Sequence, residues 1–190
     1  AISTAIACTL LVAKDSVKEQ SNESKLLSNT RQLTFAGKRS GEGYYSSDGN
    51  QMIFQSEREP GNPFYQIYLM DLETGDTNRV SPGIGKTTCA WIHPNGKKVM
   101  FSSSHSDPDA KAKQLDEIEE RKSRRIRKYS WDYDENYEIW ETATDGSNPV
   151  NLTNCKGYDA EGSYSPDGNW IAFASNRHAH AKKLSDAEKE

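Results

Sequence analysis

The chain has 190 residues, of which 34% are hydrophobic and 27% are charged, and it contains 4 Trp, 9 Tyr and 5 Phe. The apolar fraction is below the roughly 45–50% of an ordinary globular domain, but a disordered chain would lack so many aromatic residues. The net charge of −4 argues against a nucleic-acid binder, which needs a basic face. No run of apolar residues is long enough for a complete transmembrane helix. We therefore expect a loop-rich protein of one domain or one and a half.

Residues 1–13, AISTAIACTLLVA, form the continuously apolar stretch of the chain. The stretch is too short to span a bilayer, but it suits a secretory signal or anchor whose start is missing. A small residue before Cys8 loosely matches a lipoprotein processing site, so Cys8 is a candidate for lipidation. A simple signal remnant and a buried N-terminal strand or helix are the alternatives. Residues 14–30 are polar and predict a tether, and the whole segment predicts export to a bacterial periplasm or outer membrane.

Three cysteines are an odd number for a chain that is expected to be exported. If Cys8 is lipidated, Cys89 and Cys155 remain as a pair. The alternative, that both are free structural thiols, is favoured. Their spacing matches no metal motif, and neither has a nearby His that would make it a candidate nucleophile.

A tandem repeat determines the expected fold. Three segments align without gaps: EGYYSSDGNQMIFQSER (42–58), CAWIHPNGKKVMFSSSH (89–105) and EGSYSPDGNWIAFASNR (161–177). Their intervals are 47 and 72 residues, and the pairs Leu33-Thr34, Val80-Ser81 and Leu152-Thr153 keep the same intervals. Because two independent sets of residues keep the same two intervals, the similarity of the three segments is not a coincidence.

Each repeat predicts four short antiparallel strands. The first strand leads into a turn of Asp or Asn followed by Gly, and the second alternates apolar and polar residues. QIYLMDL or EIWETAT predicts the third strand, and the fourth ends at RVS or NLT. Such tandem four-stranded units are typical of β-propeller blades. The turn residues expected to stabilise the blades are Asp48, Gly49, Asn95, Gly96, Asp167 and Gly168.

The combination of YSPDGNWIAFASNR, IYLMDLETG and NLT resembles the TolB-like β-propeller repeat. The resemblance covers residues 31–177; the Ser-Pro-Asp-Gly motif is intact at 165–168 and varied at 46–49 and 93–96. The same repeat occurs in the N-terminal propellers of prolyl-oligopeptidase-type and tricorn-type proteases. More narrowly, the last repeat and the insertion before it look like an exported bacterial subgroup that often carries the propeller ahead of a di-zinc aminopeptidase domain.

The resemblance implies an all-β propeller of about six blades, of which this chain holds about two and a half. The expected parts are a fourth strand of a preceding blade (31–35), blades at 42–81 and 89–153, a half blade at 161–177, and a charged tail or the start of the missing part at 178–190. Because an unclosed propeller exposes sheet edges, we expect an N-terminal fragment of a longer protein or completion by a partner chain. Self-association into a ring is less favoured.

An insertion at about 106–136 interrupts the second blade. Residues 108–128 predict a helix that Asp107 or Asp109 caps, with basic residues toward its C-terminal end. A solvated helix is favoured over a protein-docking arm, and a nucleic-acid contact is least favoured. In the following stretch, Trp131–Asn136, a structural loop is favoured over a calcium site, because the ligand spacing is irregular.

Glu42, Cys89 and Glu161 occupy equivalent positions in the three repeats. In a propeller these positions lie on the innermost strand, so the three residues are candidates to line the central channel. The two carboxylates could bind a cation, a basic peptide or an amine terminus; a hydrated, salt-bridged wall is the alternative. Arg58, His105 and Arg177, which are also in register, are interpreted as blade-stabilising.

The sequence contains no nucleophile elbow, phosphate loop or HExxH motif. His178 and His180 could ligate a metal, but no third ligand is placed, and an exposed surface position is favoured. We therefore predict no catalytic residue, no metal and no cofactor.

The leading hypothesis is a non-enzymatic exported propeller segment that binds proteins or peptides. One alternative is the substrate-gating propeller of a larger exported peptidase whose catalytic domain is absent from this chain, and another is a structural subunit of a complex. The expected partners are a protein or peptide and the remaining blades, in cis or from another chain. No nucleic-acid partner is expected, and membrane contact is expected only through an N-terminal anchor.

Overall fold

The computed structural model describes residues 25–123, 133–181 and 185, and the chain separates into two compact units, 1–33 and 34–190. In the first unit, the described residues 25–33 contain no strand and no α-helix. Cys8 and the predicted signal segment lie outside the described residues. Within the described part, no helix has the length and apolar character needed to cross a membrane.

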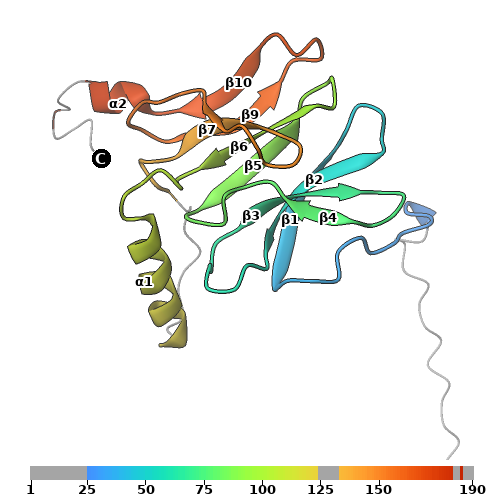
Figure 1. Cartoon of the computed structure of the whole chain (residues 1–190), viewed down its shortest axis with the longest axis horizontal. Coiled ribbons are helices and arrows are strands. Elements are labelled where there is room, and N and C mark those ends of the chain that lie inside the picture. Colours follow the sequence, from blue (N-terminus) through green and yellow to red (C-terminus); the bar gives the residue numbers. More distant parts are fainter. Residues whose placement is uncertain (1–24, 124–132, 182–184, 186–190) are drawn as a thin grey trace, which may run out of the picture. The chain divides into compact units, whose positions relative to one another are not determined.

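The second unit begins with a four-stranded antiparallel sheet (Figure 1). Its strands follow one another in chain order: β1 (Arg39–Tyr45), β2 (Gln51–Glu57), β3 (Gln66–Asp71) and β4 (Thr77–Arg79). A second sheet repeats this order with β5 (Thr87–Ile92), β6 (Lys98–Ser103), β7 (Glu138–Ala143) and β8 (Val150–Asn151). The predicted four-stranded antiparallel units are therefore confirmed.

The third repeat forms a two-stranded sheet of β9 (Asp159–Tyr164) and β10 (Ile171–Ser175). A short helix, α2 (Arg177–Ala181), follows β10. The strand predicted at 31–35 is wrong, because the structure assigns no strand before Arg39 in the described residues. A strand is held by hydrogen bonds to a neighbouring strand, and among the strands of the described residues β1 pairs with β2 alone.

Consecutive sheets pack against each other through apolar side chains from both. Ile53 and Ile67 of the first sheet share a buried cluster with Val99 and Phe101 of the second. A smaller cluster joins the second sheet to the third through Met100, Ile139 and Tyr164. The core is thus divided into layers between sheets, which suits the low apolar content of the chain.

The turn between the first two strands of a repeat is held by its Asp or Asn. Asp48 Oδ1 accepts hydrogen bonds from the Ser46 hydroxyl at 2.6 Å and the Asn50 amide at 3.1 Å, and these bonds lower the pKa of Asp48. Asp167 does the same in the third repeat, where its Oδ1 accepts from the Ser165 hydroxyl at 2.5 Å. The Asp side chains of the first and third repeats therefore hold these turns by hydrogen bonds to residues on both sides.

The second repeat builds the same turn with different side chains. The Asn95 amide donates to His93 Nδ1 at 3.1 Å, and Asn95 Oδ1 accepts from the Lys97 amide at 3.0 Å. Gly96 has φ of 70°, close to the 74° of Gly49. Asn can thus replace Asp because either side chain supplies the oxygen that accepts the backbone amide two residues on.

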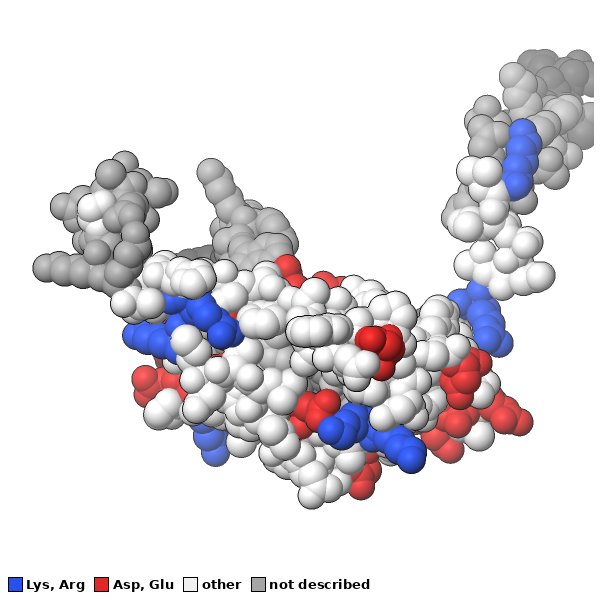
Figure 2. Space-filling model, turned by 90° about the horizontal axis from the view of Figure 1, so that it is seen from above, with Lys and Arg blue, Asp and Glu red and all other residues white. Residues whose placement is uncertain are grey.

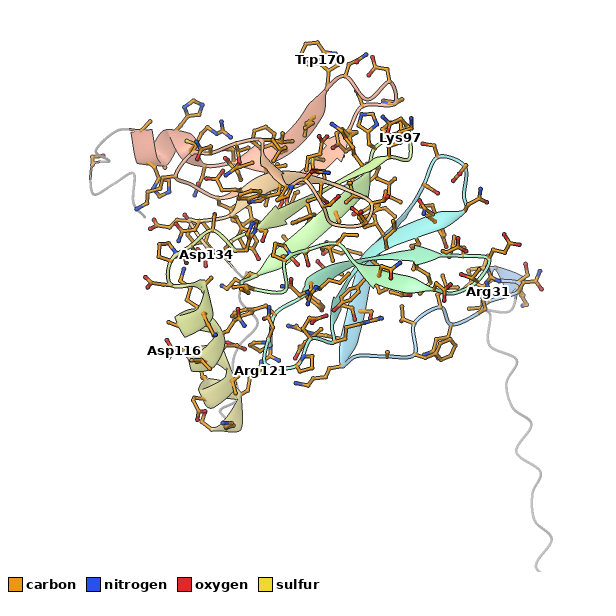
Figure 3. All side chains as sticks on the ribbon, in the orientation of Figure 1. Arg31, Lys97, Asp116, Arg121, Asp134 and Trp170 are labelled. Atoms are coloured by element: carbon orange, nitrogen blue, oxygen red, sulfur yellow. The ribbon has the colours of Figure 1, made fainter. Side chains whose placement is uncertain are left out.

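The insertion forms helix α1 (Ala110–Lys122) between β6 and β7. Asp109 is at the N-cap position but makes no side-chain capping bond, whereas the Asp107 carboxylate pairs with Lys113 at 2.6 Å. Arg121, labelled in Figure 3, donates to Glu57 Oε1 and to the Pro63 carbonyl, each at 2.8 Å. The helix is therefore bonded to the first sheet at Glu57 and to the loop at Pro63.

Residues 133–136 form a structural loop after the gap in the described chain. Both oxygens of Asp134 accept from Lys113, at 3.1 and 2.9 Å, and Asp134 Oδ1 also accepts from the Asn136 amide at 3.1 Å. The Tyr133 ring stacks on Tyr158 with centroids 5.7 Å apart. Within the stretch considered as a calcium site, the Asp134 carboxylate is thus paired with Lys113, while Trp131 and Asp132 lie outside the described residues.

Candidate functional site

The first strand of each repeat contains a β-bulge at the same place. The pairing of β1 with β2 shifts between Gly41 and Tyr44, and that of β5 with β6 between Thr88 and Trp91. The pairing of β9 with β10 shifts at Ala172 and Ala174 of β10. A bulge adds a residue to one strand and turns its side chain in a new direction.

The residue at the centre of each bulge has a left-handed backbone. The φ angles are 48° for Glu42, 48° for Cys89 and 59° for Glu161. Such angles are uncommon for residues other than Gly and concentrate at functional or structurally demanding positions. The structure thus gives the three equivalent residues the same unusual conformation.

The three bulge residues line a single pocket of about 480 Å³. Strand β5 contacts both β1 and β9, which brings together residues separated by 47 and 72 positions in the chain. The remaining lining residues are Tyr44, Ala90, Trp91, Gly162 and Ser163. The pocket therefore combines two carboxylates, one thiol and two large aromatic side chains.

A hydrogen bond joins the first two bulge residues. The Cys89 thiol donates to Glu42 Oε2 at 3.2 Å, and the Thr88 hydroxyl lies 3.2 Å from the same sulfur. Burial, together with the charge of Glu42, raises the pKa of Cys89 to about 12. The thiol is therefore protonated at neutral pH and is a poor nucleophile. The carboxylates that line the pocket are those of Glu42 and Glu161.

Aromatic rings form a second part of the pocket wall. Tyr44 and Trp91 have ring centroids 4.4 Å apart, and burial followed by the charge of Glu42 raises the pKa of Tyr44. Carboxylates beside aromatic faces favour ammonium and guanidinium groups, through charge-assisted hydrogen bonds and cation–π contact. The pocket can thus receive the side chain of Lys or Arg, or an amine terminus.

The aromatic residues were not predicted, although the repeat contained a signal for them. Tyr44 and Trp91 each stand two residues after the bulge residue of their repeat, and Ser163 stands at the third position. In a regular strand, residues two apart lie on the same face, but the bulge interrupts that alternation between Glu42 and Tyr44 and between Cys89 and Trp91. The signal was hidden because the bulge, which places these rings beside the carboxylates, is not visible in the sequence pattern.

Cys155, His178 and His180 do not line this pocket. Cys89 and Cys155 are both free thiols, so the pair is not a disulfide in this structure. His180 of α2 has its Nε2 atom 3.5 Å from the Tyr133 hydroxyl and its Nδ1 atom 3.9 Å from Glu135 Oε2. Within residues 25–123, 133–181 and 185, no group of three His, Cys, Asp or Glu side chains is arranged to hold a metal ion.

A second pocket, of about 470 Å³, lies between α1 and the loop that begins at Tyr133. Its carboxylates come from Asp116, Glu117, Glu120, Asp134 and Glu135, and Lys86 and Lys113 also line it. Lys86 lies 3.9 Å from Asp134 and Lys113 lies 2.9 Å from the same carboxylate oxygen. The Lys113 pair connects α1 to the loop, and the Lys86 pair connects the segment before β5 to the same loop. A structural role is therefore the better explanation of this pocket.

Charges of both signs are interspersed with uncharged surface on the face shown in Figure 2. No single basic patch covers that face of the described residues. Nucleic-acid binding depends on a concentration of Lys and Arg along a surface. The charge distribution on this face is therefore unlike that of a nucleic-acid interface.

The fold of the described chain is similar to that of known propeller proteins. TolB from Agrobacterium tumefaciens matches 77% of this chain with a TM-score of 0.53 and 21% identity, and the match covers 42% of that protein. TolB from Acinetobacter baumannii matches 74% of this chain and 28% of its own length, with a TM-score of 0.49 and 20% identity. A prolyl endopeptidase matches 73% of this chain and 19% of its own, with a TM-score of 0.46 and 15% identity.

No protein-family model matches the sequence. The likeness to the Agrobacterium protein nevertheless confirms the predicted TolB-like propeller relationship at the level of the fold. The chain spans less than half the length of that relative, 42%.

Proposed function

We propose that this chain is a segment of a TolB-like β-propeller that binds a protein or peptide partner at the pocket of Glu42, Cys89 and Glu161. One observation carries the proposal: three equivalent β-bulges direct these side chains into the same pocket. Left-handed backbone at a residue other than Gly is costly and persists where the surroundings demand it. All three residues adopt this costly backbone conformation, which supports a shared role for them.

The proposed ligand is the amine terminus or a Lys or Arg side chain of an extended peptide. Glu42 and Glu161 supply negative charge, and Cys89 adds none because its thiol is protonated. Tyr44 and Trp91 supply aromatic faces on which the aliphatic part of the ligand can lie. The proposed interaction with a peptide requires neither proton transfer nor bond cleavage, so we propose that the pocket binds its ligand without catalysis.

The architecture that goes with this function is a partial propeller. We interpret each four-stranded sheet as one blade and the β9–β10 pair as half of the next, so that about two and a half blades are present. The apolar layers between successive sheets support this interpretation. In it, β1, β5 and β9 are the innermost strands, and the pocket lies on the wall of the central channel.

The proposed location is the bacterial periplasm or the outer-membrane surface. This proposal rests on the apolar stretch of residues 1–13 and on Cys8 as the lipidation candidate. Intact mass spectrometry of the N-terminal peptide from native membranes tests the anchor. A diacylglyceryl adduct on Cys8 would support it, whereas a mature chain cleaved beyond Cys8 would contradict it.

Titration with a basic peptide tests the proposed pocket. The probe is Gly-Lys-Gly-Lys-Gly with a free amine terminus and a fluorescein label at its C-terminal end, and its anisotropy is followed as the full chain is added. We expect the double variant Glu42→Gln/Glu161→Gln to bind the probe about tenfold more weakly. An N-acetylated probe and a Gln-for-Lys probe show whether the amine terminus or the side chains are recognised.

The control for this titration has the same change in net charge at another place. Glu73→Gln/Asp76→Asn removes two exposed carboxylates from the β3–β4 turn, and it is expected to leave probe binding unchanged. Equal losses in the two double variants would mean that only the overall charge matters. That result, or no binding of any probe, would support a hydrated channel wall and overturn the proposed function.

A further inference from the structure

We infer that the pocket of Glu42, Cys89 and Glu161 selects an ammonium group over a guanidinium group, and that the Cys89 thiol determines this preference by occupying one oxygen of Glu42. The inference rests on the proposed function and narrows it. The ligand would present a Lys side chain or an amine terminus rather than an Arg side chain. The support comes from the hydrogen bonds that already surround Glu42.

The Cys89 thiol has one proton and two neighbouring acceptors. Its sulfur lies 3.2 Å from Glu42 Oε2 and 3.2 Å from the Thr88 hydroxyl oxygen. The Thr88 hydroxyl donates its own proton to Gln55 Oε1 at 3.1 Å, so toward the thiol its oxygen is an acceptor. A carboxylate is a stronger acceptor than a hydroxyl, and the thiol proton therefore goes to Glu42.

Gln55 supports this arrangement from within the first sheet. It lies on β2 opposite Ile67 of β3, and it is 6% exposed. Because a buried amide that loses a hydrogen-bond partner costs free energy, the Thr88 hydroxyl stays turned toward Gln55. The thiol is thus the donor that faces the pocket, and Glu42 Oε2 is held before a ligand arrives.

A guanidinium binds a carboxylate best when both carboxylate oxygens are available. Arg then donates two parallel N–H bonds, one to each oxygen, and this bidentate geometry gives it its advantage over Lys. At Glu42, the Cys89 thiol already donates to Oε2, which leaves Oε1 as the oxygen open to a ligand in the described part of the chain. An ammonium binds as a point charge and needs only one oxygen, so the thiol does not impair its binding.

The aromatic part of the pocket does not restore the advantage of Arg. A flat guanidinium between two rings would need them about 7 Å apart, which is twice the contact distance of about 3.5 Å. The ring centroids of Tyr44 and Trp91 are 4.4 Å apart, so these rings contact each other and leave no slot. Their outer surfaces can receive the aliphatic stem of Lys as well as that of Arg.

The same aromatic pair identifies Glu42 as the carboxylate that binds the cation. Burial is the largest cause of the raised pKa of Tyr44, the charge of Glu42 comes next, and the charge of Glu161 has the smallest effect. Because the interaction between charges weakens with distance, Glu42 lies closer to the Tyr44 ring than Glu161 does. A cation that contacts both a ring and a carboxylate is therefore bound at Glu42, which is the carboxylate that Cys89 holds.

Competition between two small compounds tests the preference on the full chain. Acetyl-Lys-methylamide and acetyl-Arg-methylamide present the two cations on the same backbone, and each is used to displace the labelled Gly-Lys-Gly-Lys-Gly probe. We expect the Lys compound to displace the probe at about threefold lower concentration. Since a Lys side chain and an amine terminus both present an ammonium, the N-acetylated probe described above is what distinguishes these two sources.

Substitutions of Cys89 show whether the thiol causes the preference. Cys89→Ala removes the donor and releases Oε2, so the Arg compound should bind about threefold better and the preference should disappear. Cys89→Ser keeps a hydrogen-bond donor at this position and should retain the preference. Cys155→Ala changes a free thiol that does not line the pocket, and it is the control that should leave both compounds unaffected.

The thiol proton also has a spectroscopic signature that a purely structural cysteine would not show. The S–H stretching band of Cys89 is obtained as the infrared difference between wild type and Cys89→Ala. Donation to a carboxylate weakens the S–H bond, so the band is expected at lower frequency than that of Cys155. Glu42→Gln should shift the Cys89 band to higher frequency, whereas Glu161→Gln should leave it in place.

Three results would overturn the inference. The first is displacement by the Arg compound that equals or exceeds displacement by the Lys compound in the wild-type chain. The second is a preference that survives in Cys89→Ala, and the third is a Cys89 band that Glu42→Gln does not shift. The proposed function fails on a different result, which is undiminished probe binding by Glu42→Gln/Glu161→Gln, so the two failures are distinguishable.

Discussion

Cys89 and Glu42 are 47 residues apart in the chain, and the Cys89 thiol donates a hydrogen bond to Glu42 Oε2 at 3.2 Å. The bond connects β5 of the second sheet to β1 of the first. It forms because both residues have left-handed backbone at the centre of equivalent bulges. The contact therefore results from the regular packing of one repeat against the next.

The environment of Cys89 predicts slow alkylation. Because burial and the Glu42 charge raise its pKa to about 12, only a minute fraction is thiolate at pH 8. We expect iodoacetamide to modify Cys89 at least about a hundredfold more slowly than an unhindered thiol with a pKa near 8.5. Peptide mapping by mass spectrometry between pH 7 and 10 measures the rate.

Neutralising the neighbouring carboxylate provides the control for that rate. Glu42→Gln removes a negative charge that disfavours the thiolate, so alkylation of Cys89 should accelerate while remaining slower than that of an unhindered thiol. Burial, which is the largest cause of the raised pKa, and the charge of Glu161 account for the remaining difference. Alkylation of wild-type Cys89 as fast as an exposed thiol at pH 8 would refute the prediction.

Glu141 connects the second sheet to the third and predicts a loss of stability in acid. Burial opposes its ionisation, but Lys98 at 2.6 Å and the Tyr164 hydroxyl at 2.7 Å outweigh that effect and lower its pKa. A lowered pKa in the folded state stabilises the fold above the unfolded-state pKa, near 4.3, and this contribution disappears as the pH falls through the folded value.

Urea unfolding at pH 7 and pH 3 measures this contribution. Glu141→Gln is expected to lower the free energy of unfolding by about 1–2 kcal/mol at pH 7, and the difference from wild type should shrink at pH 3. Lys97→Gln, which changes the charge of an exposed neighbour of Lys98, is the control and should have little effect. A difference that is the same at both pH values would show that ionisation of Glu141 does not contribute.

The Glu57 carboxylate is central to the attachment of α1. Its side chain is 4% exposed and pairs with Arg121, Lys38 and Arg39 at 2.8, 3.2 and 2.9 Å. Glu57→Gln removes the carboxylate that all three cations share, although Arg121 keeps its pair with Glu117, so we expect a loss of about 2–3 kcal/mol in the free energy of unfolding. Urea denaturation measures the loss.

Arg121→Ala is expected to be milder than Glu57→Gln, because Glu57 keeps two cations and the partly exposed Arg121 pair is screened by solvent. Its specific effect should be faster hydrogen exchange within α1. Lys122→Ala breaks a neighbouring ion pair that is exposed on both sides, and it serves as the control with almost no effect. Equal exchange in the Arg121 and Lys122 variants would contradict the proposed attachment.

Two equivalent turn glycines allow strain and steric clash to be separated. Gly49 and Gly168 have φ of 74° and 73°, so an added Cβ in either should cost about 1–2 kcal/mol of backbone strain. A Cβ at Gly49 meets no atom within 4 Å, whereas one at Gly168 would lie 2.5 Å from His93 Cε1. Gly168→Ala should therefore destabilise the chain more than Gly49→Ala in thermal unfolding.

The excess cost at Gly168 should depend on His93. In the background His93→Ala, the two glycine substitutions are expected to have similar effects on the unfolding midpoint, because the clash is removed and the strain remains. An excess that persists without the imidazole would mean that the strain at the two turns differs. A double-mutant cycle gives the size of the coupling.

The sequence was sufficient to predict strands, turns and their equivalence. The alternation of apolar residues and the Asp-Gly turns depend on local chemistry, which is why β2, β3, β6 and β7 lie where the repeat places them. The strand predicted at residues 31–35 failed because that segment depends on a neighbouring strand rather than on its own residues. A strand exists only where another strand satisfies its backbone hydrogen bonds.

By itself, then, the sequence determined the repeat and the register that makes Glu42, Cys89 and Glu161 equivalent. Only the tertiary structure decided that these residues share a pocket with Tyr44 and Trp91, because the bulges that turn them arise from strand pairing and leave no mark in a period of two. The ion pair between Arg121 and Glu57 is likewise visible only in the tertiary structure, because the two residues are 64 positions apart in the chain. Local patterns specify elements, whereas the contacts that give a site its chemistry exist only once those elements are packed together.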